Sequence, residues 1–395
     1  MTFLLLVGSV LAKPSLSPAA ALARSVSVIN SWEEEDGAAN SSVAQYLDLR
    51  TGGETGGFRL DLEGAGRVAS MEEEVEAGDD DLQRLYSLAL TVTKPGAEGW
   101  FTLGRQAISA LTGAAIIDGV AISVGRDPFA VTARWGLISD ISDDDPEDEE
   151  TFGIGVDYLL RPGMTLSLDY AQTSDDGGVM EELLAVDWTY SWFRYTKAYV
   201  FLNYDLMSET YHEILLGTRM LLSDLITAVV EYSQSVSQFE ADSIYSVFAV
   251  DAAETTLFSL LFTPNRNTRY TWEYAVESYG SGENGKRYNI GGRWSPGRST
   301  LSVDFKQHTG AGGELLEISL GASTYVHPKL KVGAGADIST TEPEGDESVT
   351  SYMGYLGGQW KPSSGTGLSL RVEQSDDDVL EEPTLATRLA LSVEF

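Results

Sequence analysis

The chain has 395 residues, of which 60 are acidic and 26 basic, and its net charge is −34. Such a charge repels phosphates, which excludes nucleic acid as an expected partner. Cysteine is absent, and this excludes disulfides, thiolate metal sites and cysteine nucleophiles. No internal segment offers the roughly 18 consecutive apolar residues of a transmembrane helix. If the chain spans a membrane, it must therefore do so as a closed β-barrel.

The N-terminal residues predict a secretory signal peptide. Phe3–Leu11 is a short apolar segment, and Ala21, Leu22 and Ala23 form a small-residue cleavage site. The predicted division is a signal peptide over residues 1–23 and one barrel domain over residues 24–395. No Lys or Arg precedes the apolar segment, so either the signal is atypical or the true start lies upstream. An ordinary N-terminal helix is the alternative.

From residue 24 onward, short turns alternate with longer acidic loops. The short turns carry Pro or Gly and recur about every 30 to 35 residues, the length of a hairpin of two strands. The segments between them are acidic, for example Met71–Asp81, Ile141–Thr151 and Ser375–Glu382. This alternation is typical of a membrane barrel with short turns at one rim and longer loops at the other.

The segments between these turns alternate apolar and polar residues with a period of two. Tyr270 and Trp272, for example, oppose Arg269 and Glu273. Such a pattern predicts strands with one apolar and one wet face. Counting from a first strand at Ser25–Trp32 gives about 22 strands, with a range of 18 to 22. The predicted fold class is all-β, a transmembrane antiparallel up-and-down β-barrel.

The last segment, Pro383–Phe395, supplies a family resemblance. Leu389, Leu391, Val393 and Phe395 lie on one side of an extended strand that ends in an aromatic residue. It resembles the closing strand of bacterial outer-membrane β-barrels, in which the terminal aromatic belongs to the assembly signal. The resemblance implies location in the bacterial outer membrane, with membrane lipid as a partner.

A second resemblance lies in the segment 100–124. It is similar to the GRQ…DG signature of porin-like and alginate-export-like barrels, carried here by Gly104, Arg105, Gln106, Asp118 and Gly119. The resemblance implies a strand pair near a pore, with the arginine in a charged ladder lining it. Arg105 shares its face with Phe101 and Leu103, so a β-bulge is needed to turn it inward.

Charged residues on the wet faces are the candidate pore-lining residues. They could pair across strands and set the selectivity of a pore, or they could only brace and solvate the wall. The candidates are Arg134, Arg219, Glu231, Arg269, Glu273, Glu277, Arg287, Arg293, Asp304, Lys306, Arg371, Glu373 and Arg388.

The acidic loops predict a preference for cations and neutral solutes over anions, because like charge at a mouth repels. The acidic runs Asp79–Asp81, Asp143–Asp145 and Asp376–Asp378 lack the glycine and terminal glutamate of a Ca²⁺-binding loop. We expect solvated loops, with loose binding of divalent cations as the alternative, and no dedicated metal site.

These features predict a porin-like channel for passive diffusion of small hydrophilic solutes, with no cofactor and no catalysis. The three histidines have no metal-site spacing, and His308 beside Asp304 is the one candidate for a catalytic pair. The alternative function is a structural or partner-binding barrel with a closed lumen, such as the barrel subunit of a larger complex. The transported solute and the oligomeric state stay open.

Overall fold

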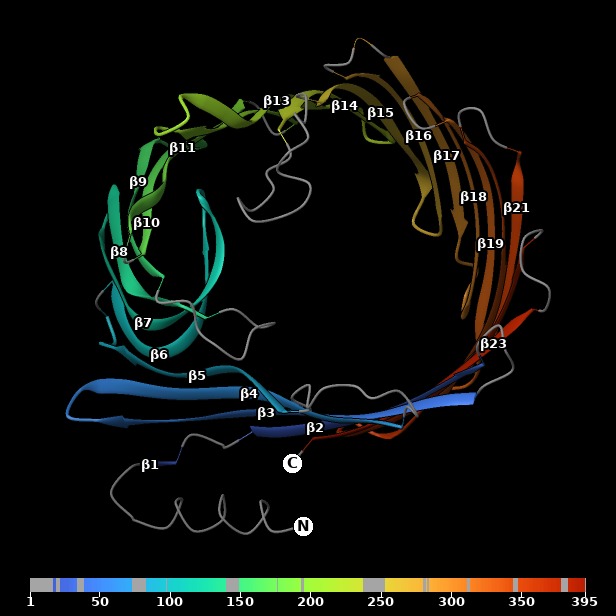
Figure 1. Cartoon of the computed structure of the whole chain (residues 1–395), viewed down its shortest axis with the longest axis horizontal. Helices are drawn as coiled ribbons and strands as arrows, with labels where there is room; N and C mark the ends of the chain where they lie inside the picture. The colour runs from blue at the N-terminus through green and yellow to red at the C-terminus, as the bar shows by residue number, and fades with distance from the viewer. Residues whose placement is uncertain are drawn as a thin grey trace.

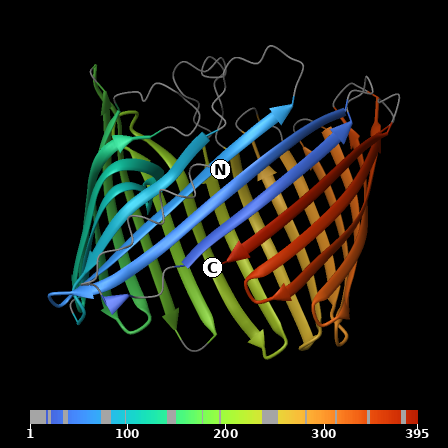
Figure 2. The same cartoon turned by 90° about the horizontal axis from the view of Figure 1, so that it is seen from below.

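The protein is one closed antiparallel β-barrel, seen end-on in Figure 1 and from the side in Figure 2. The structure is a computed structural model. It describes residues 17–18, 22–33, 39–72, 83–96, 98–139, 149–175, 177–192, 195–236, 253–279, 282, 284–310, 313–343, 347–377 and 383–394. No helix among the residues described is both long and apolar enough to cross a membrane.

The strands follow one another around the ring in chain order. Their bounds are β1 Ser17–Pro18, β2 Leu22–Glu33, β3 Ala39–Thr55, β4 Phe58–Glu72, β5 Gln83–Thr93, β6 Gly99–Ala110, β7 Gly113–Arg126, β8 Phe129–Ile138, β9 Glu150–Arg161, β10 Met164–Asp175, β11 Gly178–Trp192, β12 Thr196–Asp205, β13 Thr210–Ser223, β14 Ile226–Ser235, β15 Ala253–Asn265, β16 Thr268–Ser278, β17 Asn284–Trp294, β18 Ser299–Gly310, β19 Gly313–His327, β20 Leu330–Glu342, β21 Val349–Ser363, β22 Thr366–Asp377 and β23 Thr384–Glu394.

The barrel closes where its first long strand meets its last. β2 pairs with β23 from Arg24 opposite Glu394 to Trp32 opposite Ala386. The twenty-two strands β2 to β23 form the ring. The two-residue β1 pairs with Gly53 and Glu54 near the C-terminal end of β3. The predicted fold class, the first strand and the strand count are therefore confirmed. Phe395 lies outside the described residues, as do residues 1–16 and 19–21 of the predicted signal peptide.

Large apolar side chains are exposed on the outer face of the ring. On β15, Phe258, Leu260 and Phe262 are all exposed, while Leu257 and Ser259 occupy the other face. An exposed apolar surface that runs around a closed ring is the surface that a barrel presents to lipid. The alternating pattern of the sequence thus produces a transmembrane barrel.

The two rims differ in their connections. One rim has two-residue turns such as 56–57, 162–163, 224–225 and 328–329. At the other rim more residues separate the strands, as between the end of β22 at Asp377 and the start of β23 at Thr384. Asp376 and Asp377 end β22, whereas Asp79–Asp81, Asp143–Asp145 and Asp378 lie outside the described residues.

One hairpin leaves the wall. β5 pairs with β6 only from Thr93 opposite Trp100 to Leu88 opposite Arg105. Beyond that point β6 and β7 stay paired with each other up to Ala110 opposite Gly113. Figure 1 shows this hairpin curving from the wall into the ring.

Candidate functional site

All thirteen charged residues predicted to line the pore occupy one face of the sheet. Directly paired residues of neighbouring strands point to the same side, so the face can be followed around the ring. Starting from Arg134, the register reaches each of the thirteen on the same face. Trp135 and Phe152, which are 49% and 44% exposed, lie on the opposite, outer face.

The hairpin bends inward along a row of glycines. Gly104 on β6, Gly119 on β7 and Gly136 on β8 are direct cross-strand partners. Gly104 has a φ of 119°, which side chains disfavour, and a Cβ there would lie 2.2 Å from the Leu88 carbonyl oxygen. A Cβ on Gly119 would lie 2.1 Å from the Trp135 carbonyl oxygen. Only glycine therefore allows the backbones to approach this closely at the bend.

The other residues of the GRQ…DG element hold the bend together. Arg105 donates to Asp118 through Nε (2.9 Å) and Nη2 (2.5 Å), and through Nη1 to the Leu85 carbonyl oxygen (3.1 Å). Leu85 lies on the part of β5 that has no β6 partner in the register. The Arg105 guanidinium therefore supplies the hydrogen bond that the Leu85 carbonyl oxygen would otherwise accept from a neighbouring strand. Gln106 Nε2 donates to the Gly119 carbonyl oxygen at 3.4 Å.

The expected β-bulge at Arg105 does not form. The register of β6 with β5 and with β7 runs without a shift, so Arg105 keeps the face of Leu103, the outer face. The chain turns at Gly104 instead, because a positive φ bends the whole hairpin inward without moving one side chain to the other face. Arg105 therefore stabilises the bend at the point where the hairpin leaves the wall.

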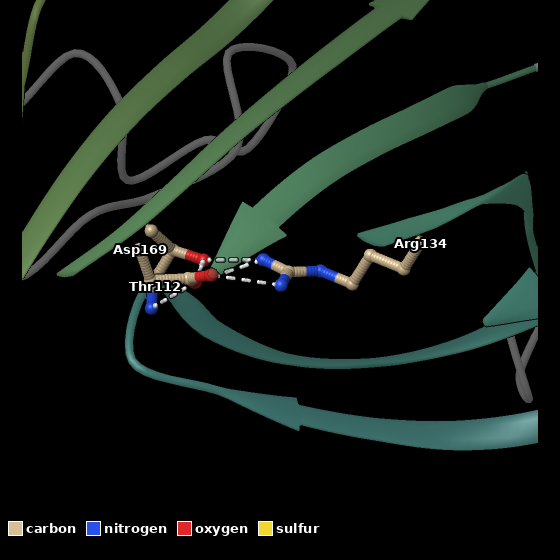
Figure 3. Close-up of polar contacts among 3 residues, drawn as sticks. All are labelled: Thr112, Arg134 and Asp169. Carbon is tan, nitrogen blue, oxygen red and sulfur yellow. Dashed lines mark hydrogen bonds and ion pairs between the residues drawn. The ribbon is translucent and has the colours of Figure 1, made fainter. Parts of the chain in front are cut away.

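A buried polar clamp holds the tip of the hairpin against the wall (Figure 3). Arg134 on β8 donates two 2.9 Å hydrogen bonds to Asp169 on β10, from Nη1 to Oδ1 and from Nη2 to Oδ2. Thr112, in the hairpin turn, donates its hydroxyl (2.6 Å) and its backbone N–H (3.2 Å) to Asp169 Oδ2. Arg134 Nη2 also donates to the Thr112 hydroxyl at 2.9 Å.

The clamp is buried, and small residues make room for it. The side chains of Arg134 and Asp169 are only 7% and 4% exposed. They meet over β9, where a Cβ on Gly153 would lie 2.4 Å from Arg134 Cζ and one on Gly155 would lie 3.0 Å from Asp169 Oδ1. A bidentate pair with added donors satisfies buried charges that would otherwise be costly.

Sequence reasoning identified only one member of this clamp. Arg134 is one of the predicted pore-lining residues, whereas Asp169 is not among the predicted site residues. Thr112 carried no signal, because its part depends on the hairpin reaching back to a strand 57 residues away. The Gly104 and Gly119 pair is the feature of the sequence that could have indicated the bend.

A second polar group lies on β16 to β18 around Glu277. Its Oε2 accepts from the Tyr279 hydroxyl (2.7 Å) and lies 2.9 Å from His308 Nε2, and its Oε1 lies 3.5 Å from Arg287 Nη1. Burial and the Glu277 carboxylate raise the pKa of Tyr279 to about 12, so the hydroxyl stays protonated and donates. His308, which the sequence offered with Asp304 as the one candidate for a catalytic pair, instead contacts Glu277.

Other predicted residues form local pairs on the inner face. Lys306 Nζ donates to Glu317 Oε1 at 2.8 Å, and Arg371 Nη2 lies 2.7 Å from Glu373 Oε2. Glu231 accepts from the Tyr199 hydroxyl at 2.6 Å. The inner wall is thus braced by contacts between side chains.

Four predicted basic residues stand apart from these pairs. Arg269 lies directly opposite Arg293, and Arg371 lies directly opposite Arg388. Within the described part of the chain, Arg219, Arg269, Arg293 and Arg388 form no ion pair within 4 Å. Like charges directly opposite each other destabilise a sheet. Because no carboxylate neutralises these four guanidinium groups among the described residues, they give the inner wall a local positive potential.

The described residues hold no group of three or more His, Asp or Glu side chains that could bind a metal ion. His212 lies 3.5 Å from Asp205, and His327 accepts from the Lys329 backbone N–H at 3.2 Å. Each of the three histidines is thus occupied in a local contact.

No family model matches the sequence. No curated protein matches it either. Among solved structures, Pseudomonas aeruginosa OpdQ is similar with a TM-score of 0.51 and 9% identity, covering 95% of this chain and 98% of that one. P. aeruginosa OccK3 (OpdO) has a TM-score of 0.49 and 10% identity, with 95% of each chain covered. A BenF-like porin from Pseudomonas fluorescens Pf-5 has a TM-score of 0.46 and 12% identity, covering 95% and 98%.

The chain has the fold of an outer-membrane porin. The OpdQ similarity extends over nearly the full length of both chains. A closed antiparallel barrel with an apolar outer face can span a membrane, because an open sheet would leave backbone groups unpaired in lipid.

Proposed function

We propose that the chain is a passive channel of the bacterial outer membrane for small hydrophilic solutes. The observation that carries the proposal is the division of the barrel into two faces, apolar outside and charged inside, around a ring of twenty-two strands. Barrels with more than about 16 strands are wide enough to enclose water or a plug. Charged residues of both signs along the inner wall suit a solute that travels in water.

The inward hairpin would narrow this passage. It leaves the wall where the pairing of β5 with β6 ends, at Leu88 opposite Arg105, and is held at Asp169, which lies mid-way along β10. A constriction fixed by a buried ion pair would limit the size of the solute without a moving part. Diffusion through such a channel requires no cofactor.

The proposed preference is for cations and neutral solutes. Support comes from the net charge of −34 and from the acidic segments at one rim, which raise the local concentration of cations. Arg219, Arg269, Arg293 and Arg388, which have no ion pair among the described residues, oppose this effect on the inner wall. Reversal potentials in a salt gradient measure the balance, and anion selectivity would remove this part of the proposal.

Conductance in planar lipid bilayers tests the channel itself. Purified, detergent-refolded protein should produce discrete current steps, and a sample boiled before addition should produce none. The folded sample must also show heat-modifiable mobility on a denaturing gel, which separates a folded barrel without current from a misfolded one. Reproducible absence of steps from the folded form would favour the alternative, a structural or partner-binding barrel with a closed lumen.

A further inference from the structure

A cavity of about 570 Å³ lies between the inward hairpin and the wall of the barrel. Its volume falls within the range of small-molecule sites, about 300 to 1,000 Å³. Strands β6 and β7 form one side, and the inner faces of β8 to β11 form the other. The clamp residues Thr112 and Arg134 border it, so the cavity exists because the hairpin is held inside the ring.

The hairpin side of the cavity is apolar. It is lined by Ala107, Ile108, Ala114, Ala115, Ile116 and Ile117. Ile117 is fully buried, and the wall adds Ala171 and Leu183 to the lining. An apolar lining of this kind favours a ligand with an apolar body.

The wall side carries one row of polar groups. Thr151 on β9, Thr173 on β10 and Glu181 on β11 are consecutive cross-strand partners, and all three line the cavity. Thr151 is only 7% exposed. Within the described part of the chain, none of these three side chains has a hydrogen-bond or ion-pair partner. Two hydroxyls and a carboxylate are therefore available to a ligand.

The charge of the cavity is negative. Arg134 borders it, but its guanidinium is neutralised by the two hydrogen bonds to Asp169. Glu181 has no cation within 4 Å among the described residues, and its charged neighbours are Asp205 and His212, which lie 3.5 Å from each other. A carboxylate beside an apolar surface attracts a cationic head group and repels an anionic one.

From this combination we infer that the cavity binds small amphipathic cations, with an apolar body against the hairpin and an ammonium group at Glu181. Thr151 and Thr173 accept hydrogen bonds from the same ammonium group, which carries three donors. The inference rests on the proposed channel function and deepens it, because it names a class of solute that pauses beside the constriction.

Isothermal titration calorimetry of the refolded protein in detergent tests the site with 2-phenylethylammonium as the probe. Its anionic and neutral counterparts, 3-phenylpropionate and 2-phenylethanol, have the same apolar body. We expect saturable binding of one cation per chain and at least about tenfold weaker binding of both counterparts, the effect of a lost charged hydrogen bond.

Two variants separate the polar and the apolar contributions. Glu181→Gln should weaken binding of the cation about tenfold or more, and Ala171→Phe should abolish it by filling the cavity. Glu314→Gln is the matched control, since it removes a carboxylate from β19, outside the cavity lining, and should bind like the unmodified chain. Heat-modifiable mobility shows whether each variant is folded. If Ala171→Phe misfolds, the binding of the three probes to Glu181→Gln tests the inference by itself.

The inference is overturned if the cation gives no saturable heat, if 3-phenylpropionate binds as tightly, or if Glu181→Gln and Glu314→Gln bind alike. Calorimetry does not depend on current. A chain that conducts without binding the cation therefore contradicts this inference alone, and a chain that binds it without conducting contradicts the proposed function alone.

Discussion

Arg134 on β8 and Asp169 on β10 are joined by two hydrogen bonds of 2.9 Å across the intervening strand β9. Both side chains are buried, and the same aspartate accepts from the hydroxyl and the backbone N–H of Thr112. This one pair therefore ties three strands of the wall to the tip of the hairpin. The shape of the passage depends on it.

Asp169→Asn should release the hairpin. The substitution keeps the shape of the side chain but leaves Arg134 as a buried charge without its partner, which costs about 3 to 5 kcal/mol. We expect a lower temperature of conversion to the unfolded gel band, together with larger and noisier single-channel currents. Asp187→Asn, on the inner face of β11 outside the clamp, should change neither. Wild-type behaviour of Asp169→Asn in both measurements would show that the pair does not hold the hairpin.

Gly153→Ala should weaken the clamp, because Gly153 on β9 lies directly under the Arg134 side chain. The added Cβ would lie 2.4 Å from Arg134 Cζ, so the guanidinium must move away from Asp169. Because the arginine can shift toward the lumen, we expect a conversion temperature between those of the wild type and Asp169→Asn. Gly354→Ala is the control, since a Cβ there meets nothing within 4 Å. Equal conversion temperatures for the two alanine variants would contradict the role of Gly153.

The alternating pattern was sufficient to predict the barrel and the faces of its strands. Arg269 and Glu273 lie on the opposite face of their strand from Trp272, and this is determined by residues of that strand alone. The pairing of the first long strand, β2, with the last, β23, follows from the strand count. The contact of Thr112 with Asp169 is of another kind. It requires a bend that positions Thr112 over the wall, and the alternation of residues within a strand does not indicate which distant strand the turn will reach.

Arg134 and Arg105 show the same limit. Alternation predicted that Arg134 faces inward, but it could not identify Asp169, since many inner-face carboxylates have the same local pattern. For Arg105 the sequence suggested a β-bulge, whereas the positive φ of Gly104 bends the whole hairpin. A backbone conformation available mainly to glycine is not visible in a pattern of apolar and polar side chains.

Asp118→Asn should have a much smaller effect than Asp169→Asn. Arg105 and Asp118 are 30% and 42% exposed, and exposed ion pairs contribute about 0 to 1 kcal/mol. Arg105 also keeps its hydrogen bond to the Leu85 carbonyl oxygen. We expect a conversion temperature close to that of the wild type. A loss as large as that of Asp169→Asn would mean that the outer pair, and not the inner clamp, fixes the hairpin.

Arg293→Gln should increase the preference for cations. Arg293 lies opposite Arg269 and forms no ion pair among the described residues, so its removal reduces the positive potential on the inner wall. The reversal potential in a potassium chloride gradient should shift toward that of potassium. Arg298→Gln, in the turn that precedes β18, is the control with the same change in net charge and a smaller expected shift. Equal shifts for the two variants would show that position on the inner wall does not matter.

The most direct test of the account is the water accessibility of neighbouring positions on one strand. The chain contains no cysteine, so Glu273→Cys and Trp272→Cys each introduce the sole thiol. In lipid vesicles, a charged thiol-specific methanethiosulfonate should label Glu273→Cys rapidly and change its conductance, while Trp272→Cys should stay unlabelled and conduct as before. Equal labelling of the two, or labelling of Trp272→Cys alone, would contradict a charged lumen enclosed by an apolar wall.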